Sequence, residues 1–388
     1  MRVAAAVVGW CVLLVVLLAG CGAGRAGREA HVGDAGRCPN GLGSPASGNG
    51  VGPIQFVGVR DGWAVVAGRV IATRDGGSSW QVRYRTTPDD LYAVDFVNPT
   101  DGWVLGRNTF LATTDGSRQW HALPDRCSRI VEIDFISPTR GFAVAGAMNA
   151  VRSTTAKVVE STDTAGRSWQ VLATPRWPQS ICFSNRLDGW LGAGGRIYRT
   201  TTGGHAWTLS LSWPPNAAAT DTDGSASVAC EPGNAAWGEL IADGGEMSQE
   251  PHIGYHTFGH AWTPIFSEAY FPTGLHVPPS PEPGGYAGPF AAISRSAAVY
   301  TDACEACGAG TSPLVLAADG GRVLDRPGVI GDITYASGVN FATTEQGWAV
   351  GTLWTDTKQH GSEPGPMRVV HTTNGGRTWQ VQYSTQPR

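Results

Sequence analysis

The stretch Thr73-Arg74-Asp75-Gly76-Gly77-Ser78-Ser79-Trp80 decides the fold, because a version of this phrase occurs seven times along the chain. Self-similarity at a spacing of tens of residues is typical of a repeat architecture, and it outweighs any local interpretation. We call each copy the turn phrase. The other six copies are centred on Asp115, Asp163, Thr202, Thr257, Asp319 and Asn374.

A second motif, Gly-Trp, precedes the turn phrases. Its clear copies are Asp61-Gly62-Trp63, Asp101-Gly102-Trp103 and Asp188-Gly189-Trp190, and the sixth repeat keeps only Ala298-Val299-Tyr300. Seven residues before the aromatic residue of this motif lies a mostly aromatic column, and two residues earlier lies an apolar one. Apolar positions two apart are the periodicity of a β-strand. The aromatic column consists of Phe56, Phe96, Phe135, Phe183, Cys230, Ile293 and Phe341.

Each unit is expected to contain four short strands. Strand A carries the aromatic column, strand B follows Gly-Trp, strand C leads into the turn phrase, and strand D follows it. Seven such units in a row predict an all-β fold, a seven-bladed β-propeller of four-stranded antiparallel blades over residues 51–388. The 53 Gly and 25 Pro, with only 15% charged residues, fit many short strands joined by tight turns.

The turn phrase resembles the Asp-box, or BNR repeat, whose pattern is Ser/Thr-x-Asp-x-Gly-x-x-Trp. The resemblance covers residues 54–384, although Asp is lost at Thr202, Thr257 and Asn374 and Leu324 replaces one closing Trp. Gly-Trp followed by Thr-Thr-Asp-Gly-Gly-x-x-Trp is similar to the propeller of the photosystem II stability and assembly factors. Sialidase-like propellers are a more distant likeness. The closer likeness implies a protein-binding scaffold.

Elementary chemistry gives the turn phrase a structural role. Asp accepts backbone N–H groups within a hairpin turn, Gly permits a positive φ, and Trp folds back onto the blade. Calcium binding by Asp is the alternative, but no phrase carries a second carboxylate suited to a metal, so no metal or other cofactor is expected. The residues given this role are Asp75, Trp80, Asp115, Trp120, Asp163, Trp169, Trp207, Trp262, Asp319, Asn374 and Trp379.

Loop lengths indicate which face of the propeller binds a partner. The A–B turns and the turn phrases, at one end of every blade, keep a nearly constant length, whereas the B–C hairpins and D–A linkers at the other end vary widely. Variable loops on a rigid scaffold usually carry binding and catalysis. We therefore expect binding on the face opposite the turn phrases, with drift of surface loops as the alternative. Blades 5 to 7 carry the longest segments there: Ala242–His256, Thr301–Leu314, Trp354–Met367 and Pro264–Phe290.

Two sets of side chains are candidates for ligand contact. Aromatic residues in a Pro-rich linker could stack on sugars or grip a peptide, or they could pin the linker onto the propeller. A polar column on the innermost strands could hold waters, a cation or a ligand, or its members could hydrogen-bond to neighbouring backbone. The linker set is Tyr270, Phe271, Tyr286 and Phe290, and the polar column is Gln55, Asp95, Asp134 and Asn340.

The first residues predict an export signal. Val7–Leu18 is an apolar run too short for a confident membrane span, and Leu18-Ala19-Gly20-Cys21 resembles the lipobox of bacterial lipoproteins. The resemblance implies a signal peptide over residues 1–20, acylation of Cys21 and a location on the outer face of the bacterial cytoplasmic membrane. Residues 21–50 would then hold the lipidated Cys and a flexible spacer. An ordinary cleaved signal or a short membrane helix is the alternative.

Six cysteines remain outside the signal and the anchor, and an even count outside the cytoplasm suggests disulfides. Cys182 and Cys230 are the preferred pair, because they lie on the innermost strands of adjacent blades, one position apart in register. The remaining candidates are Cys304 with Cys307, and Cys38 with Cys127.

Two further patterns are weighed as metal sites and set aside. Cys304-Glu305-Ala306-Cys307 lacks both the βαβ setting of a redox motif and the second Cys-x-x-Cys of a zinc site. His252, His256 and His260 are four residues apart and would align on a helix, but His260 lies within a turn phrase. Neither pattern predicts a bound metal.

Composition and motifs favour a binding protein over an enzyme. A net charge of −4 without a basic block argues against nucleic acid as a partner. We expect a membrane-anchored, extracytoplasmic scaffold for a protein or another cell-envelope ligand. The alternative is a glycoside hydrolase, sialidase-like or endoglucanase-like, although the Arg-Ile-Pro signature of sialidases does not precede the first turn phrase. Its two carboxylates would come from Asp95 with Asp134, or from Glu268, Asp302 and Asp356, and spacing singles out none of them.

Overall fold

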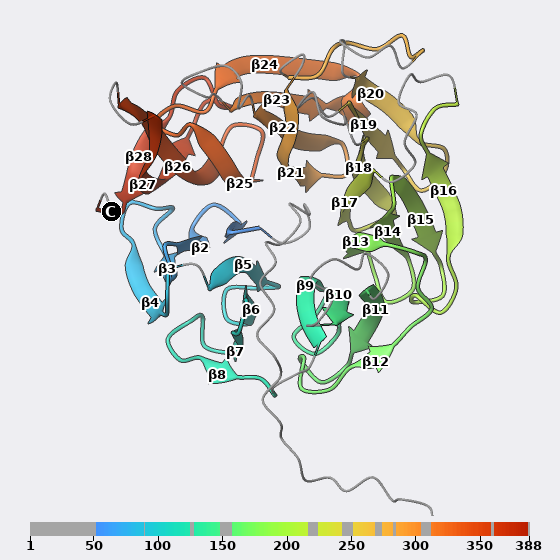
Figure 1. Cartoon of the computed structure of the whole chain (residues 1–388), viewed down its shortest axis with the longest axis horizontal. Coiled ribbons are helices and arrows are strands. Elements are labelled where there is room, and N and C mark those ends of the chain that lie inside the picture. The colour runs from blue at the N-terminus through green and yellow to red at the C-terminus, as the bar shows by residue number, and fades with distance from the viewer. Residues whose placement is uncertain are drawn as a thin grey trace, which may run out of the picture. The chain divides into compact units, whose positions relative to one another are not determined.

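The computed structural model describes residues 52–88, 90–124, 128–147, 157–215, 224–242, 251–267, 274–281, 285–303, 312–357 and 361–386. Seven four-stranded antiparallel sheets follow one another around a ring, from blue to red in Figure 1. The predicted seven-bladed β-propeller is confirmed. All seven sheets belong to the compact unit Cys38–Arg388, which is distinct from Met1–Arg37. No helix in the described part of the chain is long and apolar enough to cross a membrane.

Within every blade the strands follow chain order from the centre of the ring to its rim. Blade 1 contains β1 (Ile54–Val57), β2 (Asp61–Val66), β3 (Arg69–Thr73) and β4 (Gln81–Arg85). Blade 2 contains β5 (Leu91–Phe96), β6 (Gly102–Gly106), β7 (Phe110–Thr113) and β8 (His121–Ala122). Blade 3 contains β9 (Ser128–Phe135), β10 (Gly141–Ala147), β11 (Lys157–Thr162) and β12 (Gln170–Val171). Blade 4 contains β13 (Pro178–Phe183), β14 (Gly189–Ala193), β15 (Arg196–Thr200) and β16 (Thr208–Ser212).

The last three blades complete the ring. Blade 5 contains β17 (Ser225–Glu231), β18 (Ala235–Ile241), β19 (His252–Thr257) and β20 (Thr263–Ser267). Blade 6 contains β21 (Tyr286–Ser294), β22 (Ala297–Ala303), β23 (Pro313–Ala318), the 3-10 turn η3 (Asp319–Gly321) and β24 (Val323–Val329). Blade 7 contains β25 (Tyr335–Phe341), β26 (Gly347–Thr357), β27 (Gly361–Thr372) and β28 (Gln380–Ser384).

The position of a strand within its blade decides how it is buried. The second strands are covered by a neighbouring blade on each face, and β14 is buried at every residue while β2 is exposed in part only at Asp61. The outermost strands β4 and β28 are exposed or half-buried throughout. A strand buried on both faces needs a nearly continuous apolar sequence, which is what Gly102–Gly106 and Gly189–Ala193 supply.

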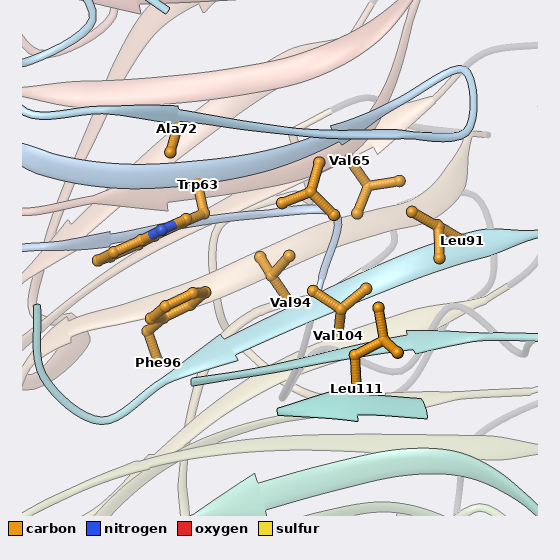
Figure 2. Packing of buried hydrophobic residues seen from close by; sticks show 9 residues of the cluster. Trp63, Val65, Ala72, Leu91, Val94, Phe96, Val104 and Leu111 are labelled. Atoms are coloured by element: carbon orange, nitrogen blue, oxygen red, sulfur yellow. The ribbon is translucent and has the colours of Figure 1, made fainter. Parts of the chain in front are cut away.

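Aromatic stacking joins blade 7 to blade 1 and blades 1 to 4 to one another. Figure 2 shows Trp63 of β2 facing Phe96 of β5, with Val65, Val94 and Val104 beside them. The ring centroids of Trp63 and Phe96 are 3.6 Å apart and the rings are 8° from parallel. The closing Trp of the turn phrase in blade 2, Trp120, meets the same Phe96 ring edge-on at 6.1 Å. The Phe96 ring is therefore held between two aromatic rings.

The same arrangement recurs around the ring. Stacked pairs with centroids 3.4 to 3.6 Å apart join Phe56 to Trp348, Phe135 to Trp103 and Phe183 to Phe142. The edge-on partners are Trp80 on Phe56, Trp169 on Phe135, Trp207 on Phe183 and Trp379 on Phe341. The aromatic columns seen in the sequence are therefore the contacts between blades.

The glycine of Gly-Trp makes room for the strand A ring. A Cβ on Gly189 would lie 2.6 Å from Cδ1 of Phe183, far inside normal contact. In blade 5 the ring is missing, because Cys230 takes the position of Phe, and Ala236 replaces the glycine opposite it. The two substitutions go together, because the space that the phenylalanine ring fills in other blades is free in blade 5 and admits the methyl group of Ala236.

Blade 6 differs from the sequence alignment by one residue. Ala298 pairs with Ala317 and Ala292, as Gly62 pairs with Thr73 and Phe56 in blade 1. Val299 therefore takes the place of Trp63, and the assignment of Tyr300 and Ile293 to the aromatic positions is wrong. The spacing between strands A and B is unchanged, because Ala292 lies six residues before Ala298 as Phe56 lies six before Gly62, and a β-bulge between Ala292 and Ser294 offsets a shorter turn. Ser294 pairs with Ala297, whereas Val57 pairs with Asp61.

The ring closes between blades 7 and 1 without a shared strand. Phe56 stacks on Trp348, and the Phe56 N–H donates to Oδ1 of Asn340 at 3.0 Å. Nε1 of Trp348 donates to the Gly76 carbonyl at 3.2 Å. Side-chain contacts of the kind found at the other blade interfaces thus hold the two ends of the propeller together.

Gly189→Ala should destabilise the propeller by about 1–3 kcal/mol, because the new methyl group collides with the Phe183 ring. Ala236→Gly is the matched control. This change removes a methyl group at the equivalent position of blade 5, where Cys230 replaces the strand A ring. It should lower the free energy of unfolding by at most about 1 kcal/mol. Urea unfolding followed by tryptophan fluorescence measures both changes, and equal losses would contradict this account of the motif.

Candidate functional site

The Thr and Asp side chains of the clearest turn phrase accept hydrogen bonds from its own backbone, while carbonyls such as that of Gly76 accept from a neighbouring blade. Oγ1 of Thr73 accepts the Gly77 N–H at 2.8 Å, and Oδ1 of Asp75 accepts the Ser79 N–H at 2.9 Å. Hydrogen bonds from Ser79 and Thr73 lower the pKa of Asp75 to about 2. Gly76 and Gly77 have φ of 73° and 92°, which glycine adopts without strain because it has no Cβ atom.

In blade 3 the acceptor is Oγ1 of Thr164, whereas Asp163 pairs with Arg140 and Arg186, so the turn role predicted for Asp163 is wrong. Two of the phrases that lack the aspartate keep this hydrogen bond. Oγ1 of Thr202 accepts the Ala206 N–H at 2.9 Å, and Oδ1 of Asn374 accepts the Thr378 N–H at 2.9 Å. A hydroxyl, an amide and a carboxylate all serve, because the turn needs an acceptor and not a charge.

The polar column of the innermost strands binds the backbone of the next blade. Oε1 of Gln55 accepts the Phe96 N–H at 2.5 Å, and Asp95 accepts the Phe135 N–H at 2.8 Å. The same bond joins Asp134 to Phe183 at 2.6 Å and Asn340 to Phe56 at 3.0 Å. These side chains therefore link blade 7 through blades 1, 2 and 3 to blade 4.

A disulfide continues this series. Cys182 stands in the polar column of blade 4 and is bonded to Cys230 of blade 5, with Cα atoms 5.8 Å apart. The preferred pair is confirmed. Cys38, Cys127, Cys304 and Cys307 lie outside the described residues, as does Cys21.

Burial changes the acidity of the inner carboxylates. Burial raises the pKa of Asp95 to about 7, against hydrogen bonds from the Phe135 N–H and Gln55. The pKa of Asp134 lies well above its ordinary value, first because of burial and then because of the charges of Asp95 and Glu132. Both acids are committed to backbone amides, and neither lines the cavities found on the two faces of the ring.

Of the four linker aromatic residues, the structure describes Tyr286 and Phe290, and neither is exposed. Phe290 is 3% exposed and stacks on Tyr300 with ring centroids 4.7 Å apart, which leaves no face for a ligand. Tyr286 is half-buried in the same strand. Tyr270 and Phe271 lie outside the described residues, as does the loop acid Glu268.

A cavity of about 560 Å³ opens between blades 7 and 1, on the face opposite the turn phrases. Its walls come from the B–C hairpins of both blades and from the ends of β4 and β28. No acidic residue is among the described residues that line it. The lining residues used below are Arg69, Arg85, Pro88, Met367 and Tyr383.

A smaller cavity of about 260 Å³ lies on the other face, between blades 2 and 3. Trp103, His121 and Arg167 contribute to its walls, beside the turn phrases of these blades. Each face therefore carries a hollow, and binding on the face opposite the turn phrases stays a prediction.

Sequence reasoning missed Arg69 and Arg85. Arg69 is the first residue of β3, Arg85 is the last residue of β4, and the two are register partners. The residues that form the other wall of the cavity are almost 300 positions away in the chain, so no local pattern joins them to the two arginines. It also missed the one described group that could share a cation, Glu239 with His252 and Asp302.

Comparison with known proteins supports the fold and one family likeness. Residues 49–173, which span blades 1 to 3, match the family model of the photosynthesis system II assembly factor YCF48. No curated protein matches the chain. The structure of YCF48 from Cyanidioschyzon merolae is similar at 14% identity, with a TM-score of 0.51 over 86% of this chain and 97% of that one.

An ancestral GH74 enzyme is similar at 16% identity, with a TM-score of 0.54 over 88% of this chain. The chain spans about half the length of that enzyme, 48%. A YCF48 structure with bound D1 peptide has a TM-score of 0.48 at 13% identity, covering 88% of each chain. At these identities the likenesses establish the propeller fold alone.

Asp95→Asn should stabilise the protein near pH 8 and remove part of its pH dependence. The folded chain keeps the Asp95 proton up to about pH 7, whereas the unfolded chain releases it near 3.8, so stability falls as pH rises between these values. Asparagine cannot ionise, and Asn340 shows that it accepts the equivalent N–H.

Denaturant unfolding at pH 4 and pH 8 measures this effect. We expect a gain of roughly 1–4 kcal/mol at pH 8 and little change at pH 4. An equal pH slope in the wild type and in Asp95→Asn would contradict the assignment.

Proposed function

We propose that the chain is a lipid-anchored, extracytoplasmic propeller that binds an extended, acidic protein segment in the cavity between blades 7 and 1. Three observations support this proposal. The first three blades match the model of an assembly factor family, the cavity lies on the face of variable loops, and the described residues of its lining carry positive charge without negative charge.

The cavity with Arg69 and Arg85 is the observation that carries the proposal. Neither guanidinium forms an ion pair with another described residue, so both charges remain available to a carboxylate. Arginine binds carboxylates through two parallel N–H donors, which gives orientation as well as affinity. An acidic side chain or a chain terminus therefore fits between them.

The rest of the lining suits an extended chain. Pro88, Met367 and Tyr383 offer apolar surface, and methionine and tyrosine adapt well to varied side chains. β4 and β28 are the outermost strands of their sheets, so their free edges run beside the cavity. An extended segment gains main-chain hydrogen bonds by lying along such an edge.

A hydrolase has less support. Asp95 and Asp134, the inner pair of carboxylates, each accept a backbone N–H of the next blade. Of the loop acids, Asp302 is 1% exposed and lies between blades 5 and 6. Binding therefore explains the described surface better than catalysis.

Charge reversal tests the cavity. We expect Arg69→Glu with Arg85→Glu to abolish photocrosslinking from a benzophenone amino acid placed at Tyr383 in membranes of the source cells. Arg167→Glu, which reverses a charge in the cavity on the other face, is the matched control and should leave the adduct unchanged.

The crosslinked segment, synthesised as a peptide, should bind the double variant at least about tenfold more weakly than the wild type, and more weakly in high salt. Fluorescence anisotropy measures this affinity. Adducts of equal yield from the wild type and the double variant would overturn the binding site.

Cys21→Ala tests the anchor. Labelling with a radioactive fatty acid should mark the wild type and Cys11→Ala, in which the cysteine of the apolar run is replaced, but not Cys21→Ala. Two or more acyl chains give durable attachment, so only Cys21→Ala should lose its membrane association. Retention of label in Cys21→Ala would show that Cys21 is not the lipidated residue.

A further inference from the structure

We propose that Glu239, His252 and Asp302 bind a divalent first-row transition-metal ion between blades 5 and 6. One donor atom from each residue lies within 4.8 Å of the other two. Nε2 of His252 is 3.3 Å from Oδ1 of Asp302. The residues are 0%, 0% and 1% exposed, so the group is fully enclosed.

Strand alternation directs all three side chains into the same interface. On β18, Trp237 and Glu239 share one face, and Trp237 packs against blade 6. On β19, His252 and His256 share the face opposite Ile253 and Tyr255, which pack against blade 4. On β22, Asp302 shares the face of Tyr300, which packs against Phe266 of blade 5.

The equivalent positions in blades 1 and 2 carry no polar side chain. Glu239 lies two residues after Trp237, as the buried Val65 and Leu105 lie two residues after Trp63 and Trp103. Asp302 lies four residues after Ala298, and the buried Val66 lies four after Gly62. Two carboxylates thus replace two apolar side chains in an interface that is otherwise closed and hydrophobic.

The donor set indicates the class of ion. Two carboxylates held this close in a site without solvent repel each other, and a cation of charge +2 offsets that repulsion. One imidazole nitrogen with two carboxylate oxygens suits Zn²⁺ or Mn²⁺, whereas Mg²⁺ and Ca²⁺ prefer oxygen ligands alone. Three protein ligands leave room for one or more waters.

The surroundings keep the group closed and rigid. The His252 ring meets Phe266 edge-on, with centroids 6.2 Å apart. The described part of the linker is fastened to β20 and β24, because the Ser280 N–H donates to the Ser267 carbonyl at 2.9 Å and Arg326 donates to the Ser280 carbonyl at 3.0 Å. The ion would join blades 5 and 6 at an interface where Ala229 stands in the polar column and offers no acceptor to the next blade.

Metal uptake by the full chain tests the proposal. The protein is stripped with a chelator and given Zn²⁺, Mn²⁺ or Mg²⁺ separately. A Cys304→Ser/Cys307→Ser background removes thiol ligands. Mass spectrometry of the desalted protein should find one Zn²⁺ or Mn²⁺ per chain and no Mg²⁺, and the melting temperature should rise only with the first two ions. No uptake, or uptake of Mg²⁺ alone, would overturn the site.

Variants locate the ion. Asp302→Asn and His252→Gln should each weaken binding at least about 100-fold, whereas His256→Gln should not. His256 is the matched control, because it lies on the same face of β19 and its Nε2 contacts the Arg295 carbonyl at 2.9 Å. Circular dichroism of the stripped proteins checks folding, and Glu239→Gln replaces any variant that does not fold. Wild-type affinity in a folded ligand variant would overturn the assignment.

Discussion

The stack of a strand A ring on a strand B ring of the preceding blade is the contact on which the propeller depends. No strand is shared between blades, so each interface must be made by side chains. Phe96 shows the full arrangement, with Trp63 on its face, Trp120 at its edge and Gly102 beneath it. The repeated motifs are therefore conditions for closing a ring, and they carry no information about a ligand.

Departures from this rule gather in blades 5 and 6. Cys230 replaces the strand A phenylalanine and forms the disulfide to blade 4. In blade 6, Val299 takes the place of the tryptophan, so the next residue, Tyr300, lies on the face toward blade 5 and stacks on Phe290. Buried polar groups then fill space that apolar side chains fill elsewhere. Because repeats are held to one pattern by packing, these breaks in the pattern are where a different chemistry can reside.

The inner column serves the fold rather than a ligand. Each of its polar side chains accepts an amide hydrogen of the next blade, and burial raises the pKa values of Asp95 and Asp134. A binding site on this scaffold must therefore come from the loops and strand ends. The cavity lined by Arg69 and Arg85 is such a place, because the two ends of the propeller meet there.

The sequence by itself determined the number of blades, the strand order, the turn phrases and the choice of Cys182 with Cys230. These follow from local periodicity, which one chain carries in full. Only the tertiary structure decided the one-residue shift in blade 6, the partners of Asp95 and Asn340, the cavity between blades 7 and 1, and the meeting of Glu239 with Asp302. Each of these joins residues of different blades or depends on the pairing register within a single blade. A repeat pattern does not specify such contacts, because they are fixed only when the ring closes and the side chains pack.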